Sequence, residues 1–205
     1  MALHADALGV LEAWDPGPGR QRDLRDRFVS HLRARPDAMT RACFPDHLTA
    51  GVLVLSDDLE RVLLNLHGKA RRWFAFGGHS EPADQTLAGV ALREAVEESG
   101  VADLRLDLLP VQLDQHAVDF CDPRGTVQHL DVRFAARAPD GAVPSVSAES
   151  MAVRWWPVDD LPDLEDEMHT LIGAARARFA QSQSTSSSPS PGGGSSWAAA
   201  DQPDR

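Results

Sequence analysis

Three glutamates stand close together in the middle of the chain, at Glu94, Glu97 and Glu98. On a helix, positions i, i+3 and i+4 share one face, so carboxylates placed there repel one another by a few tenths of a kcal/mol per exposed pair. Arg93 reaches this group through Glu97 at i+4, and an excess of negative charge remains. A divalent cation would neutralise that excess, and carboxylate oxygens suit Mg²⁺ or Mn²⁺.

A second interpretation of the three glutamates is a solvated acidic helix face with no ligand. The preceding loop favours the metal site, because Gly77-Gly78 allows the backbone to approach a ligand closely. The loop leads into the N-terminal end of the acidic helix, so a loop carbonyl can join the carboxylates.

The acidic segment is predicted to be a helix over Thr86–Ser99, closed by Gly100. A stripe of Ala88, Leu92, Ala95 and Val96 is expected to pack on a sheet. The predicted strands are Gly51–Leu55, Val62–Leu66, Trp73–Phe76, Leu104–Leu113, Gln128–Ala135 and Val153–Val158. A closing helix is expected within Leu161–Phe179.

The chain divides into three predicted regions. Residues 1–46 form an N-terminal helical extension, in which Leu24, Phe28 and Leu32 make an apolar stripe that docks on the next region. Residues 47–180 form the main domain. Residues 181–205 are rich in Ser, Pro and Gly, and we expect them to be disordered because they bury too little apolar surface to offset the entropy of ordering.

Composition limits the partners. The 205 residues carry 31 acids against 20 Lys and Arg, a net charge of −11, which disfavours a nucleic acid polymer. We find no signal peptide and no apolar stretch long enough to span a bilayer, so the sequence predicts a cytoplasmic protein without membrane contact. The two cysteines, Cys43 and Cys121, lack the spacing of a metal site and are expected to be ordinary thiols.

The segment from Arg93 to Val101 resembles the signature of the Nudix hydrolase family, G-x5-E-x7-R-E-U-x-E-E-x-G-U, where U is a bulky apolar residue. Gly78 matches the opening glycine, and Asp84 stands in place of the first glutamate. The spacing from Asp84 to Arg93 is one residue longer than in the signature. The Trp-containing segment near Trp155 is also similar to the family, so the resemblance covers about residues 47 to 165.

This resemblance implies an α/β (α+β) fold with a mixed β-sheet sandwiched between helices, here with an N-terminal helical extension. It implies cleavage of a phosphoanhydride bond in a nucleoside diphosphate linked to another group, by metal-activated water attack at phosphorus. The metal ligands would be Glu94, Glu97, Glu98 and the Gly78 carbonyl. The predicted catalytic residues are Arg93, which holds a glutamate in position, and the candidate bases Glu97, Glu98 and Glu149. Two residues on the polar face of one strand, His129 and Arg133, are candidates for binding a small phosphorylated nucleotide.

Two other functions remain open. One is a Nudix-like module that senses a nucleotide without cutting it, which an intact set of three glutamates disfavours. The other is isoprenoid isomerisation, found in relatives with extra metal-binding histidines and a catalytic cysteine, but Cys43 and Cys121 show no such pattern. The sequence leaves the exact substrate, the number of metal ions and the oligomeric state open, a homodimer included.

Overall fold

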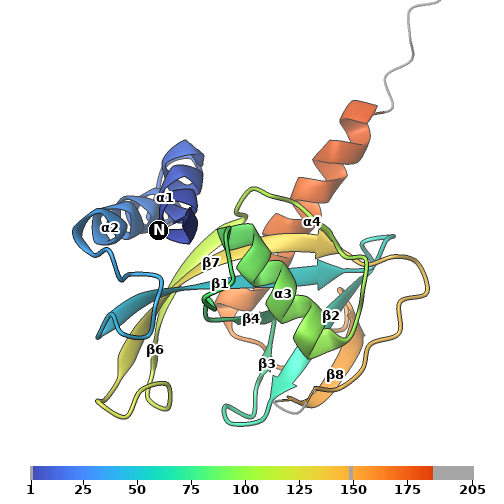
Figure 1. The fold of residues 1–205 in the computed structure, drawn as a ribbon. Helices are drawn as coiled ribbons and strands as arrows, with labels where there is room; N and C mark the ends of the chain where they lie inside the picture. Colours follow the sequence, from blue (N-terminus) through green and yellow to red (C-terminus); the bar gives the residue numbers. More distant parts are fainter. Residues whose placement is uncertain (1, 148–149, 187–205) are drawn as a thin grey trace, which may run out of the picture.

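The computed structural model describes residues 2–147 and 150–186, and it consists of a curved mixed sheet between helices (Figure 1). The helices are α1 (Ala2–Ala13), α2 (Arg20–Ala34), α3 (Leu87–Ser99) and α4 (Asp166–Ser186). The strands are β1 (Asp46–Leu55), β2 (Arg61–His67), β3 (Trp73–Phe74), β4 (Phe76–Gly78), β5 (Arg105–Leu106), β6 (Gln112–Val118), β7 (Val127–Arg137) and β8 (Ser150–Pro157).

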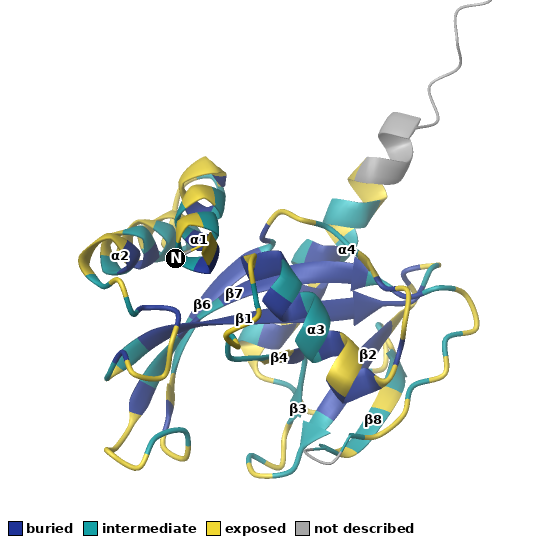
Figure 2. Ribbon diagram, in the orientation of Figure 1, coloured by how far each residue is buried: buried dark blue, intermediate teal, exposed yellow. Residues whose placement is uncertain are grey.

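Strand β1 forms the centre of the sheet. It pairs antiparallel with β2 and β4, and parallel with β7 over its whole length, from Asp46 opposite Gln128 to Leu55 opposite Arg137. Strand β6 pairs with β7, and β8 pairs with β2. Nearly every residue of β1 is buried, as expected for a strand covered on both faces (Figure 2).

Two cores lie on opposite faces of the sheet. On one face, Val52 and Val54 of β1 pack with Ala91 and other apolar residues of α3. On the other face, Leu53 of β1 packs with Leu171 and its neighbours on α4. Because side chains alternate between the two faces along β1, this strand contributes residues to both cores. The predicted class, a mixed sheet between helices, is confirmed.

The two N-terminal helices dock on the α3 face, as the apolar stripe predicted. Phe28 and Leu32 of α2 are fully enclosed and belong to the same core as α3. Helix α1 adds a polar contact, because the Asp6 carboxylate accepts a 2.7 Å hydrogen bond from the backbone N–H of Leu87. A carboxylate at a helix N-terminus is favourable, so this contact fixes the start of the acidic helix.

Several local expectations are wrong, and one of them is the predicted strand Trp73–Phe76, which is divided into β3 and β4. The predicted strand Leu104–Leu113 is broken into β5 and β6, because Leu108 and Leu109 are exposed at a turn that precedes Pro110. Val96 is 37% exposed, since it lies one position beyond the buried stripe that contains Ala91 and Ala95.

Helix α4 continues to Ser186, so the first residues of the segment expected to be disordered are helical. The remainder of that segment, residues 187–205, lies outside the described part of the chain. Within the described residues, no helix is both long and apolar enough to cross a membrane.

Candidate active site

Local signals position the acidic helix α3. Thr86 caps its N-terminus, where the Thr86 side chain accepts a hydrogen bond from the Gly89 N–H at 3.1 Å. Gly100 ends it in the left-handed conformation, with φ of 67°, and donates its N–H to the Val96 carbonyl. The predicted helix and both of its ends are confirmed.

The three glutamates differ in burial. Glu98 is 9% exposed, and one of its carboxylate oxygens lies 3.4 Å from the backbone N–H of Gly77, which donates to it. The Glu94 side chain is 16% exposed, whereas that of Glu97 is 56% exposed. Glu94 and Glu98 thus face the end of β4, at Gly77 and Gly78, and Glu97 lies at the solvent-facing edge of the group.

Gly78 makes the close fit between this loop and α3 possible. A Cβ atom at position 78 would lie 2.6 Å from Oε1 of Glu94, closer than real side chains approach. At Gly77, a Cβ would lie 2.6 Å from the Cα of Gly51 on β1. The two glycines therefore let the loop backbone pass between the central strand and the Glu94 carboxylate.

Arg93 connects the loop to the helix. Its guanidinium donates to the His79 carbonyl at 2.9 Å, to Oε1 of Glu94 at 3.1 Å and to Oε2 of Glu97 at 3.0 Å. It also donates to both carboxylate oxygens of Asp84, at 3.3 and 3.0 Å. Paired in this way, Arg93 fixes the position of two of the glutamates relative to the loop.

Asp84 has a definite place in this arrangement despite the extra residue in its spacing. Burial alone would raise the pKa of the Asp84 carboxyl, but hydrogen bonds from Arg93 and from the Glu81 N–H hold that pKa below its ordinary value. Asp84 is therefore ionised at neutral pH and orients Arg93 from the loop side.

Arg133 is not exposed toward a substrate. It is 9% exposed, and its guanidinium donates to Asp131 at 2.8 Å, to Gln112 at 3.0 Å and to Asp114 at 3.0 Å. The polar face of β7 was predicted correctly, but Gln112 and Asp114 of the neighbouring strand β6 bind Arg133 on that face, so the geometry gives no support to a contact between Arg133 and phosphate. Glu149, the candidate base from the late loop, lies outside the described residues.

His129 belongs to a cluster that the sequence analysis missed. Across residues 2–147 and 150–186, one set of His, Cys, Asp and Glu side chains has all of its potential ligand atoms within 4.8 Å of one another. That set is His47, His79, Cys121 and His129, and it does not include the three glutamates. Cys121 is a free thiol, as expected. It lies among three imidazoles, however, which is not the environment of an ordinary thiol.

The three imidazoles of this cluster are neutral at pH 7. Burial lowers the pKa of His79 to about 3 and that of His129 to about 4, and it also lowers the pKa of His47. No local pattern pointed to the cluster, because its members come from distant parts of the chain. In the structure, the parallel pairing of β1 with β7 brings two of them together, because it places His47 opposite His129.

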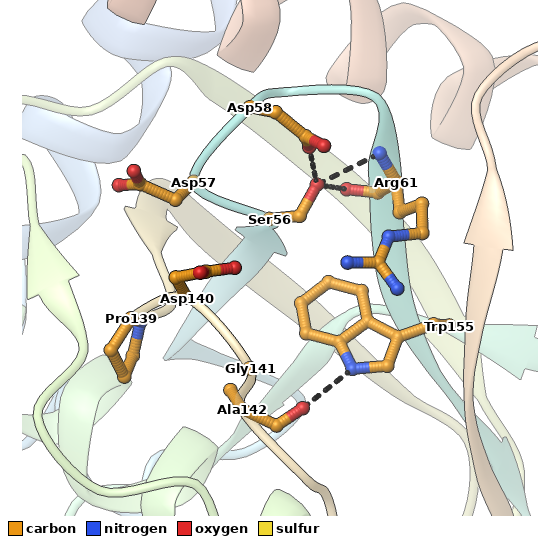
Figure 3. Close-up of a pocket in the computed structure, with 9 residues that line it drawn as sticks. All are labelled: Ser56, Asp57, Asp58, Arg61, Pro139, Asp140, Gly141, Ala142 and Trp155. Carbon is orange, nitrogen blue, oxygen red and sulfur yellow. Dashed lines mark hydrogen bonds between the residues drawn. The ribbon is translucent and has the colours of Figure 1, made fainter.

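A hollow of about 260 Å³ lies at the turn between β1 and β2, at the edge of Trp155 (Figure 3). Asp57, Asp58 and Asp140 line it together with Arg61, so its charge disfavours a phosphate group. Its lining includes none of the residues of the acidic helix. We therefore do not assign the substrate to it.

Comparison with known proteins identifies the family of this chain. The family model described as NUDIX domain matches residues 45–175, and a search of curated proteins finds no match. Similar solved structures include a NUDIX-family hydrolase from Clostridium perfringens, with 20% identity and a TM-score of 0.52, covering 65% of this chain and 97% of that one.

An Ap4A hydrolase from C. elegans is 18% identical with a TM-score of 0.52, covering 65% of this chain and 98% of that one. The E. coli dihydroneopterin triphosphate pyrophosphohydrolase is 15% identical with a TM-score of 0.51, covering 64% and 95%. At these identities the likeness shows the fold. With the family model matching well over half of the sequence, the chain belongs to the NUDIX domain family.

Proposed function

We propose that this protein cleaves the phosphoanhydride bond of a nucleoside diphosphate linked to another group, using Mg²⁺ or Mn²⁺. One observation carries the proposal: the Glu94 carboxylate is fitted against the Gly78 backbone, where a Cβ atom would lie only 2.6 Å from it. A solvated acidic surface has no need of so close an approach between a carboxylate and a loop. Such an approach is expected where the loop and the helix bind the same metal ion.

The donor set fits a hard divalent cation. Glu94, Glu97 and Glu98 supply carboxylate oxygens, and Gly78 supplies a carbonyl oxygen, which are the ligands that Mg²⁺ and Mn²⁺ prefer. The hydrogen bonds of Arg93 to Glu94 and Glu97 offset part of the repulsion among the carboxylates. We assign these four residues as the ligands.

When bound, the metal would shield the negative charge of the pyrophosphate and lower the pKa of a coordinated water. A carboxylate oxygen of Glu97 or Glu98 takes the proton of the attacking water as the new bond to phosphorus forms. Glu149 is the third candidate for this base. Arg93 acts as a positioning residue, because it holds Glu94 and Glu97 through their carboxylates and the loop through the His79 carbonyl.

The proposal does not extend to substrate contacts by Arg133, whose donors are engaged by acidic and amide side chains. We do not assign His129 to the substrate either, because its Nε2 atom lies 3.3 Å from the Cys121 thiol. The substrate class therefore follows from the reaction alone. It is a nucleotide that contains a pyrophosphate linkage.

The test is product release from a substrate panel in Mg²⁺ and in Mn²⁺. The panel contains nucleoside triphosphates, dinucleoside polyphosphates, nucleotide sugars and oxidised nucleotides, with Glu97→Gln/Glu98→Gln as the inactive control. Metal-dependent cleavage of one class between two phosphates supports the proposal. Tight binding of a nucleotide with no cleavage of any member would instead establish the sensing module.

An isoprenyl diphosphate is added to the panel because a cysteine does meet several histidines in the structure. Isomerisation of that compound without phosphate release would replace hydrolysis as the function. Cleavage of a nucleotide with no change in the isoprenyl compound would exclude it.

A further inference from the structure

Four side chains from distant parts of the chain meet at one end of the sheet. His47 is the second residue of β1, and the parallel register places it directly opposite His129 of β7. His79 follows the last residue of β4, and Cys121 belongs to the connection between β6 and β7. The pairing of β1 with β4 and β7 thus brings all four together.

The ligand atoms lie nearly as close together as those of a coordination shell, all within 4.8 Å of one another. Nε2 of His47 lies 3.0 Å from Nε2 of His79, and Sγ of Cys121 lies 3.3 Å from Nε2 of His129. The same sulfur is 3.5 Å from Nε2 of His79 and 4.0 Å from Nε2 of His47. Ligands bonded to tetrahedral zinc at about 2.0–2.3 Å are separated from one another by roughly 3.3–3.6 Å.

The ring of His47 is already oriented for such a role. Its Nδ1 atom lies 3.2 Å from the Cys43 carbonyl, which can only accept, so the ring proton is on Nδ1. The lone pair of Nε2 then faces the other three groups. A backbone carbonyl that fixes the tautomer in this way is the usual outer partner of a metal-binding histidine.

Binding of an ion would change which nitrogen of the His79 ring carries the proton. The Arg41 guanidinium donates to Nδ1 of His79 at 3.1 Å, so without an ion the ring proton is on Nε2 and points toward His47. Coordination through Nε2 requires that proton to be on Nδ1, so Arg41 must withdraw. Arg41 is exposed and can do so. The Cys121 thiol loses its proton to solvent as the metal–sulfur bond forms, so binding releases one proton.

We propose that His47, His79, Cys121 and His129 form a tetrahedral site for a transition metal ion of the zinc class. The donor set selects the ion, because a thiolate with imidazoles favours Zn²⁺ over Mg²⁺. The site is distinct from the carboxylate site of Glu94, Glu97 and Glu98. Four protein ligands leave no open position, which is typical of a structural zinc ion.

The ion would tie the signature loop to the rest of the sheet. His79 directly follows Gly78, and its carbonyl accepts the hydrogen bond from Arg93 at 2.9 Å. Cys121 lies in the β6–β7 connection, which would otherwise be held at this point by weak thiol contacts. A metal bonded to both residues would therefore fix the loop on which the proposed Mg²⁺ ligands depend.

The test uses the full-length protein, stripped of metal and titrated with Co²⁺ as a spectroscopic substitute for Zn²⁺. We expect the intense visible bands of tetrahedral Co²⁺ and a thiolate-to-cobalt charge-transfer band in the near ultraviolet. Both should saturate at one equivalent and disappear when Zn²⁺ is added. A weak octahedral spectrum in the wild-type protein, which requires no variant, would overturn the proposal.

Matched variants identify the ligands. Cys121→Ala should lose the charge-transfer band, whereas Cys43→Ala, the same change at the other cysteine, should keep it. His129→Ala should weaken Co²⁺ affinity by at least about tenfold. Far-ultraviolet circular dichroism confirms that each variant is folded. A charge-transfer band that survives in Cys121→Ala and disappears in Cys43→Ala would contradict the assignment.

The Glu97→Gln/Glu98→Gln protein separates this proposal from the proposed hydrolytic function. Its tetrahedral Co²⁺ spectrum should equal that of the wild type, because the two sites share no ligand. Loss of the tetrahedral spectrum in this variant would show that the ion depends on the glutamates, and it would overturn the second site even if hydrolysis is confirmed.

Discussion

Replacing Glu98 by glutamine separates a catalytic carboxylate from a structural one. Glutamine preserves the size of the side chain, and its carbonyl can still accept from the Gly77 N–H, which lies 3.4 Å from the glutamate oxygen. The substitution removes one negative charge from a side chain that is 9% exposed and stands at i+4 from Glu94. Charge at position 98 is thus the main quantity that changes.

Stability and activity should respond in opposite directions. Relief of one i,i+4 repulsion raises the free energy of unfolding of the metal-free protein by about 0.2–0.5 kcal/mol. If Glu98 is a metal ligand or the base, turnover falls by about a hundredfold or more. At about 1.36 kcal/mol per decade of rate, a hundredfold loss is about 2.7 kcal/mol of transition-state stabilisation.

The assay combines urea unfolding in EDTA with steady-state kinetics in saturating Mg²⁺ on the best substrate of the panel. Glu60→Gln is the matched control, because the Glu60 side chain is 69% exposed and lies 3.8 Å from its partner Arg176. That control should change stability by less than about 0.5 kcal/mol and leave turnover unchanged. Wild-type turnover in Glu98→Gln would refute the assignment of Glu98, and a large loss of apo stability would show that its charge is structural.

Three further outcomes are expected. Gly78→Ala should lower activity strongly, because the added Cβ would lie 2.6 Å from Oε1 of Glu94 and would displace that flexible carboxylate; wild-type activity would show that position 78 does not require glycine. Zn²⁺ at a hundred times its dissociation constant should stabilise the wild type by about 2.7 kcal/mol, a rise in Tm of roughly 5–10 °C in a thermal scan, and should leave the Tm of Cys121→Ala unchanged. Burial would raise the pKa of Asp114, but the His116 hydrogen bond and the Arg133 charge hold that pKa below its ordinary value, so its stabilising contribution is full above about pH 4 and lost as pH falls through the lowered pKa. Asp114→Asn should therefore cost about 3 kcal/mol at pH 7 and less in acid, as measured by urea unfolding across pH, and an equal cost at every pH would contradict this account.

The acidic helix was predictable because every signal for it is local. Thr86, Gly100 and the spacing of the glutamates lie within one short segment, and helix capping depends on neighbouring residues alone. The same holds for the second half of β1, Gly51–Leu55, whose continuous apolar run indicates a strand buried on both faces. The exposure of Val96 and the break at Pro110 depend on how these elements pack, which a periodic pattern does not specify.

The environment of β7 was predicted only in part. Alternation along the strand correctly placed His129 and Arg133 on one face. It could not show that Gln112 and Asp114 of the neighbouring strand β6 would lie on the same face and engage Arg133. Alternation distinguishes the two faces of a strand, but the neighbouring strand determines whether the polar face meets solvent or other polar side chains.

The histidine–cysteine cluster was not predictable from spacing. His47 and His79 are separated by 32 positions, and His47 and Cys121 by 74, so no metal-binding motif is visible along the chain. Their meeting depends on the parallel register of β1 and β7, which is a tertiary property. The contacts of Arg93 were likewise predictable only in part. Its contact with Glu97 follows from helical spacing, whereas its contacts with Asp84 depend on the path of the loop.

The most direct test of the central claim follows the oxygen of the attacking water. The wild-type protein is incubated with its best substrate and Mg²⁺ in water enriched in heavy oxygen, and the products are analysed by mass spectrometry. Water attack at phosphorus predicts that one phosphate-containing product carries a single heavy oxygen, and that EDTA prevents its formation. Failure of every panel member to be cleaved in Mg²⁺ or Mn²⁺, or products without the label in phosphate, would contradict the account.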